Sequence, residues 1–211
     1  MKKLIYLLTT ILLLGTFYGG YAQSDKMNNR EIEKVCKKRT KELTKQGWTI
    51  SGTSLTLEAA FLKFMRTTNS GENKELIVDV SMCKSINVCK SIAFNNALVD
   101  YASTASSFVL GRATSEMFNN SSAAVPEEFD KFFASYERLV QGEIRGELEF
   151  SFAIEKPNGA GRAYSAYYII NEEKASKARL RAFKRAAEEA NIEQLYTGQI
   201  ENFVREGFEF K

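Results

Sequence analysis

Histidine is absent from this 211-residue chain, which also holds only two prolines and one tryptophan. The absence of His removes the commonest general base and every catalytic triad that depends on imidazole. It also removes the usual nitrogen ligand of zinc, and the few cysteines do not have the spacing of a zinc site. We therefore expect no metal, no cofactor and no histidine-dependent catalysis.

Cysteine is scarce as well, with Cys36, Cys83 and Cys89 as the three thiols. An odd count leaves at least one of them unpaired or bonded to another chain. We favour three buried free thiols, because Cys packs well as a small hydrophobic residue. The alternative is a disulfide between Cys83 and Cys89, which lie where a predicted strand is followed by a predicted helix.

Long apolar runs are missing except at the N-terminus. Two lysines after Met1 precede an apolar run that begins at Leu4, and the small residues Gly20 and Ala22 follow before a polar stretch. This is the layout of a secretory signal peptide. A retained membrane anchor is the alternative, but the run of about 15 residues is shorter than the roughly 20 that span a bilayer. We predict a cleavable signal peptide at residues 1–22 and a single domain at residues 23–211.

The short basic start and short apolar region are typical of bacterial signal peptides. No Cys follows the small residues, so the lipid attachment of bacterial lipoproteins is not available there. The predicted location is therefore the periplasm of a Gram-negative bacterium, or its outer membrane by association. No transmembrane span is expected once the signal peptide is removed.

The predicted mature chain has no large excess of charge of either sign. The full sequence has 29 Lys and Arg against 26 Asp and Glu. Lys2 and Lys3 leave with the signal peptide, so 27 basic residues face 26 acidic ones and the net charge falls to +1. A nearly neutral protein has no bulk electrostatic reason to bind nucleic acid, and we expect no such partner.

Hydrophobic periodicity predicts helices and three strands. Asn28 and Glu31 form a capping-box pattern at the start of the first helix. The expected order is a helix to Gly47, a helix from about Thr56, a strand at 75–83, a helix at 86–118, a helix to about 142, paired strands within 147–154 and 164–170, and a last helical region at 171–207.

This order predicts an α+β fold, in which a small antiparallel three-stranded sheet is packed by helices on one face. Residues 86–142 would form a long inserted αα hairpin. A projecting helical pair offers a groove or a self-association surface. We therefore expect this hairpin to be the interaction element and the protein to be a candidate homo-oligomer.

Basic side chains are concentrated in the first predicted helix. Lys34, Lys37, Lys38 and Lys41 form a candidate site for an anionic polymer or lipid head group of the cell envelope. The alternative is an ordinary solvated helix face, whose charge is balanced by Glu31, Glu33 and Glu42.

Acidic residues occur as the neighbouring pairs Glu127/Glu128, Glu172/Glu173 and Glu188/Glu189. Two opposed carboxylates perform glycoside hydrolysis. Adjacent residues on a helix do not face a common cleft, however, so these pairs are weak candidates for catalysis.

Three features resemble those of a known group of proteins. They are the stretch Gln46-Gly47-Trp48-Thr49-Ile50, the alternating strand followed by a long Ala-rich helix, and the ending, with Lys177 to Ala182 and Phe203 to Phe208. Small exported proteins of Bacteroides-type bacteria, which have no assigned function, are similar in these features. The core of those proteins looks like the fold of the small Lpp-type surface lipoproteins, in which helices flank a sheet. The resemblance implies an envelope location and this fold, and it carries no catalytic signature.

The predicted function is therefore a non-catalytic binding or structural role in the cell envelope, with an envelope protein or polymer as the partner. One alternative is a carboxylate-dependent hydrolase of an envelope polymer, which needs two carboxylates converging in a cleft. Another is a small-ligand carrier, which needs an apolar cavity between sheet and helices.

Overall fold

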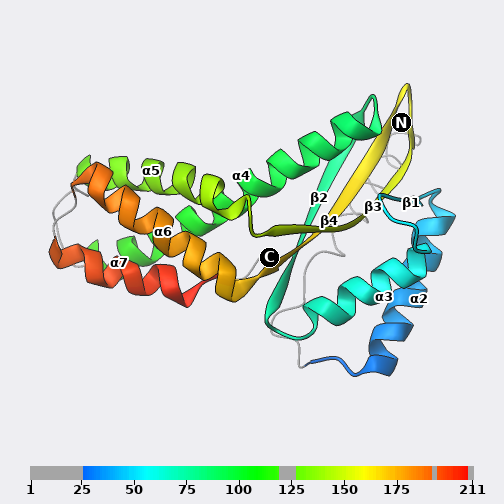
Figure 1. The fold of residues 1–211 in the computed structure, drawn as a ribbon, viewed down its shortest axis with the longest axis horizontal. Coiled ribbons are helices and arrows are strands. Elements are labelled where there is room, and N and C mark those ends of the chain that lie inside the picture. Colours follow the sequence, from blue (N-terminus) through cyan, green and yellow to red (C-terminus); the bar gives the residue numbers. More distant parts are fainter. Residues whose placement is uncertain (1–25, 119–126, 192–193, 209–211) are drawn as a thin grey trace, which may run out of the picture.

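The computed structural model describes residues 26–118, 127–191 and 194–208. In this part of the chain, six helices and a four-stranded antiparallel sheet form an α+β fold, as the sequence predicts. Figure 1 shows the sheet in the middle of an elongated molecule, with a bundle of helices at one end and a pair of helices at the other. The predicted signal peptide at 1–22 lies outside the described residues.

The helix pair is formed by α2 (Asn29–Lys45) and α3 (Leu57–Thr68). The predicted capping box is confirmed: Asn28 Oδ1 accepts from the Glu31 backbone N–H, and Glu31 Oε2 accepts from the Asn28 backbone N–H. Thr56 caps α3 through its side chain. Local capping chemistry thus defines where both helices begin.

The sheet contains β1 (Thr49–Ser51), β2 (Asn73–Cys83), β3 (Leu148–Asn158) and β4 (Gly161–Asn171), in the order β1-β3-β4-β2. The three predicted strands are present, but the prediction of a three-stranded sheet is wrong. Residues 49–51 read as a short extended link, and they pair with residues 153–155 of β3 as a fourth strand.

Helices cover both faces of the sheet, which corrects the expectation of a single covered face. On the central strand β4, Tyr164 and Tyr168 join the larger core with the bundle, whereas Tyr167 and Ile169 join a smaller core with α2 and α3. A strand that is buried on both faces needs a helical layer on each side.

A β-bulge divides the apolar residues of β3 between these two cores. Phe150 pairs with Tyr168 and Phe152 pairs with Tyr167, so one extra residue lies on β3 between them. Phe150 contacts Tyr168 on the bundle side, whereas Phe152 stacks on Tyr167 on the α2–α3 side. The predicted uninterrupted alternation from Leu148 to Ile154 is therefore wrong, because a bulge re-aims every later side chain.

The bundle contains α4 (Ile86–Ala113), which ends in a π-helical turn at Thr114–Phe118, with α5 (Glu127–Ile144), α6 (Glu172–Ala190) and α7 (Gln194–Glu206). The single helical region predicted for 171–207 is two helices. Asn191 ends α6 in the left-handed conformation that Asn tolerates, with φ of 52°.

The predicted helical pair formed by α4 and α5 does not project from the fold. Figure 1 shows α6 lying along α5, with α7 beside it. Tyr101 of α4, Phe132 of α5 and Phe183 of α6 share one core with Leu76 of the sheet. The bundle and the sheet therefore depend on each other for their buried surface.

Candidate functional site: the basic face of helix α2

Helix α2 lies against α3 and the sheet through one narrow face. Ile32 and Cys36 are buried in the smaller core, and Leu43 packs against it. These positions recur at helical spacing, so the opposite face of α2 is left to solvent.

That outer face carries the predicted lysines. Successive residues on a helix are about 100° apart, so Lys34, Lys38 and Lys41 lie roughly 180–240° around the axis from Ile32. We define the basic face of α2 as the exposed residues Arg30, Lys34, Lys37, Lys38, Lys41 and Lys45. From Lys34 to Lys45 it is about 16 Å long.

Two of the three glutamates of α2 have partners away from this face. Glu31 is the capping-box partner of Asn28, and Glu33 forms an ion pair with Arg66 of α3 at 3.0 Å. Within residues 26–118, 127–191 and 194–208, no ion pair involves the four predicted lysines. Two of the three glutamates that could balance the lysines therefore have other partners, and Glu42 stays exposed on α2.

Arg39 is the basic residue of α2 that points the other way. Its guanidinium lies 5.2 Å from the centre of the Phe61 ring and 5.9 Å from that of Tyr167. It also lies near Glu75, whose pKa is raised by burial, an effect that the Arg39 charge opposes. Arg39 thus belongs to the packing between α2 and the sheet.

The cysteines differ from the favoured expectation of three free thiols. Cys83 and Cys89 form a disulfide with a Cα–Cα distance of 5.4 Å, whereas Cys36 is free and buried. Burial raises the pKa of the Cys36 thiol. The sequence left the Cys83–Cys89 disulfide as an alternative, because the pattern does not show the irregularity near the end of β2 that turns Cys83.

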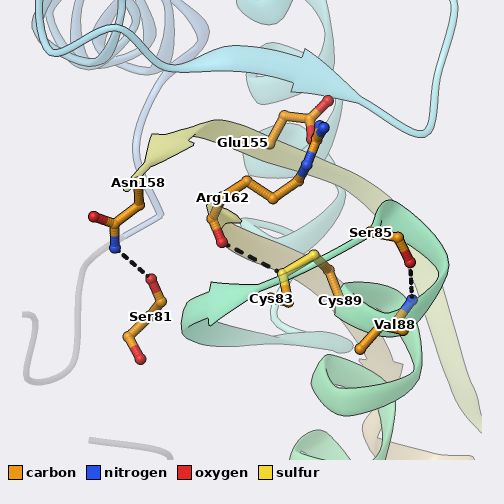
Figure 2. The surroundings of a disulfide bond; sticks show 8 residues. All are labelled: Ser81, Cys83, Ser85, Val88, Cys89, Glu155, Asn158 and Arg162. Atoms are coloured by element: carbon orange, nitrogen blue, oxygen red, sulfur yellow. Dashed lines mark hydrogen bonds and ion pairs between the residues drawn. A yellow bond between two sulfur atoms is a disulfide. The ribbon is translucent and has the colours of Figure 1, made fainter. Parts of the chain in front are cut away.

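A second bulge brings the two sulfurs together. Val80 pairs with Tyr164 and Cys83 with Arg162, so one extra residue lies on β2. Figure 2 shows Cys83 turned toward Cys89 in the first turn of α4, where Ser85 caps the helix. The bulge reverses the pleat, so Cys83 is buried and Met82 is 62% exposed.

A buried ion pair holds the C-terminal segment against the bundle. Arg179 is 1% exposed and donates to Glu172 Oε1 at 2.6 Å and to the Tyr101 hydroxyl at 2.5 Å. Gly207 passes close by with φ of +74°, and a Cβ there would lie 2.7 Å from Glu172 Oε1. The cluster fits a structural role, because the described side chains already occupy its hydrogen-bonding groups.

The acidic pair at the start of α6 does not form a shared carboxylate site. In the pair that begins α6, Glu172 binds Arg179 inside the fold and Glu173 binds the exposed Lys177. The side chain of Glu127 is outside the described residues.

A different pair of carboxylates is brought together at an open pocket of about 280 Å³ between α4 and α7. Glu116 and Glu206 both bind the guanidinium of Arg112 there. These two glutamates are far apart in the sequence, and no local pattern marks them as partners. The arginine fills the space between the carboxylates.

An aromatic pocket of about 190 Å³ lies at the side of α4 that faces β4 and β3. Lys90, Phe94, Phe150 and Tyr168 line it. Its volume is below the roughly 300–1,000 Å³ of typical small-molecule sites. It therefore gives less support to a carrier function than the basic face gives to polyanion binding.

Comparison with protein-family models, with curated proteins and with solved structures gives no match. The resemblance to exported envelope proteins stays a prediction. No described helix is both long enough and apolar enough to cross a membrane. The described residues also contain no group of three or more Cys, Asp or Glu side chains placed to hold a metal ion.

Proposed function

We propose that this protein is exported to the bacterial cell envelope and binds a polyanion there through the basic face of α2, without catalysis. The shared chemistry of the ligand is a row of phosphate or carboxylate groups, as on an anionic envelope polymer or a phospholipid surface. The observation that carries the proposal is the row of exposed cations opposite the buried face of α2, whose lysines form no ion pair with the described residues.

Export is supported by two independent features. The layout of residues 1–22 is that of a signal peptide. The Cys83–Cys89 disulfide is of a kind that persists in oxidising compartments and is rare in the cytosol.

Polyanion binding is supported by the rigidity of the site. The capping box fixes the start of α2, and Ile32, Cys36 and Leu43 fix its rotation. The cations are therefore presented together along one helix, so they act as a unit on a repeated anionic ligand. Nearby lysines contribute roughly equal increments to attraction by an anionic surface.

The test measures binding of the purified mature chain to two probes, inorganic polyphosphate and phosphatidylglycerol vesicles. The variant Lys34→Gln/Lys38→Gln/Lys41→Gln is expected to weaken binding about 100-fold, and salt is expected to weaken wild-type binding. The matched control, Lys84→Gln/Lys174→Gln/Lys184→Gln, changes the net charge equally at exposed positions off α2 and should retain wild-type affinity.

Binding to vesicles but not polyphosphate would identify a lipid surface as the ligand, and the reverse would identify a soluble or wall polymer. The proposal fails if wild type binds neither probe, or if both triple variants lose the same affinity. In the second case only the net charge matters and α2 is not the site.

The carboxylate-dependent hydrolase remains the second candidate, because Glu116 and Glu206 meet at an open pocket. One carboxylate oxygen of each glutamate accepts a hydrogen bond from Arg112, which favours a structural interpretation of the pair. Release of reducing sugar or peptide from isolated envelope by wild type, and its loss in Glu206→Gln, would instead establish catalysis.

A further inference from the structure

The aromatic pocket beside α4 lies on the bundle side of the sheet, on the face opposite to α2. Its volume is about 190 Å³, and Lys90, Phe94, Phe150 and Tyr168 line it. Helix α4 packs mainly over β2 and only in part over β4, which leaves room beside it on this face. Tyr168 of β4 is 3% exposed, whereas Phe150 of β3 is 37% exposed. The pocket thus has one buried aromatic ring and one that faces solvent.

The exposed ring of Phe150 is held in place by its neighbours. It packs edge-to-face against Tyr168, with 5.7 Å between the ring centres. It also lies against the backbone at Gly52, where an added Cβ would be 2.9 Å from Phe150 Cζ. The ring is therefore already in position before a ligand arrives, which lowers the entropic cost of binding.

Three rings of different orientation surround the pocket. The planes of Phe94 and Phe150 are inclined to that of Tyr168 by 55° and 68°. Aromatic pairs favour edge-to-face or offset contacts, so a guest ring can meet the face of one ring and the edge of another. An apolar cavity of about 150 Å³ holds benzene. This pocket therefore has room for one benzene-sized ring with a short side chain.

Two cations lie at these rings. Lys90 lines the pocket, and the Arg145 guanidinium is 5.6 Å from the centre of the Phe94 ring. Both residues are exposed, and neither forms an ion pair with another described side chain. Glu147, two residues after Arg145, instead pairs with Arg181 of α6 at 3.6 Å.

The acidic residues of α4 and β3 do not offset these cations. Helix α4 has no Asp or Glu before Asp100. Glu149 of β3 pairs with Ile169 of the smaller core, so its side chain lies on the opposite face of the sheet. Glu155 of β3 is engaged by Arg162 at 2.5 Å. The local excess of positive charge favours an anionic ligand.

We propose that this pocket binds a small aromatic carboxylate. The ring of the ligand lies among Phe94, Phe150 and Tyr168, and its carboxylate accepts a hydrogen bond from Lys90 Nζ. This site goes beyond the proposed polyanion binding and is separate from it, because α2 packs on the other face of the sheet.

The experiment is calorimetric titration of the purified mature chain with phenylacetate, which joins a ring to a carboxylate. The dissociation constant is expected on the order of 0.1–1 mM, as for an efficient ligand of about ten non-hydrogen atoms. Phenylacetamide keeps the shape and lacks the charge, and acetate keeps the charge and lacks the ring. Each should bind about tenfold more weakly or worse.

Two matched pairs of variants locate the site. Lys90→Gln should weaken phenylacetate binding about fivefold, whereas Lys174→Gln, which removes an equal charge at an exposed position of α6, should not. Gly52→Ala should weaken binding because its Cβ displaces Phe150. Gly47→Ala should not, although Gly47 has the same φ of +80°, because no atom lies within 4 Å of its added Cβ.

The outcomes separate this pocket from the basic face of α2. Saturating inorganic polyphosphate should leave phenylacetate affinity unchanged, and displacement of phenylacetate by polyphosphate would overturn the proposal by placing the carboxylate on α2. Failure of wild type to bind phenylacetate at about 10 mM, well above the expected range, would overturn it as well. So would equal affinity for phenylacetamide, or equal losses in the two variants of either matched pair.

Discussion

Reduction of the Cys83–Cys89 disulfide should destabilise the protein by an amount that follows from its short loop. The bond joins residues six positions apart, and it closes a loop of seven residues. Loss of the loop-closure constraint from the unfolded chain corresponds to about 2 kcal/mol for a loop of that size. For a domain of this length, the midpoint of thermal unfolding should fall by roughly 5–10 °C.

The measurement is urea or thermal unfolding of the mature chain with and without a thiol reductant, followed by circular dichroism. The variant Cys83→Ala/Cys89→Ala is the control, since reductant should not change its unfolding midpoint. The wild-type midpoint should fall in reductant. That fall reports on the Cys83–Cys89 bond alone, because the third thiol, Cys36, is already free.

An unchanged wild-type midpoint would refute this reasoning. It would mean either that the disulfide is absent, or that the bulge of β2 and the cap of α4 already hold this loop in the unfolded ensemble. Mass spectrometry after alkylation of the oxidised protein separates the two, since only the first predicts three modified cysteines.

Three further predictions concern the C-terminal cluster. The variant Arg179→Met should lower the free energy of unfolding by about 3 kcal/mol, because it leaves Glu172 without its buried partner. The control Lys177→Met removes an exposed ion pair and should leave the urea midpoint unchanged. Gly207→Ala should also destabilise, by more than about 1 kcal/mol, because its φ is positive and its Cβ would meet Glu172; equal stability of this variant would show that the segment shifts without cost. Burial raises the pKa of Tyr101 to about 12 from its ordinary 10, so its contribution to stability is complete below about pH 10 and is lost as the pH rises toward 12. Urea midpoints at about pH 9 and about pH 11 should therefore differ, and the difference should shrink in Tyr101→Phe.

The sequence predicts best what local chemistry decides. The start of α2 follows from Asn28 and Glu31, since both capping hydrogen bonds form within four residues. The strands at β2 and β4 follow from alternation, and the exposed lysines of α2 follow from helical spacing opposite Ile32. These features need no knowledge of distant segments.

The bulges were not predictable in the same way. A bulge adds one residue to a strand and leaves no clear mark in the composition or hydrophobic pattern of the sequence. Yet the bulge in β3 places Phe152 in the second core, and the bulge in β2 turns Cys83 toward Cys89. The favoured interpretation of free thiols was wrong for this reason. The strand at Thr49–Ser51 was missed because three residues are too few to show an alternating pattern.

Long-range placement was decided only by the tertiary structure. The alternating and helical patterns determined which residues are buried, because burial of apolar surface is the main driving force and each element has a fixed period. They could not determine which buried faces meet, because that depends on how all the layers pack at once. The meeting of Glu116 and Glu206 on Arg112, the position of β2 at the end of the strand order, and the second helical layer on the sheet all belong to this class.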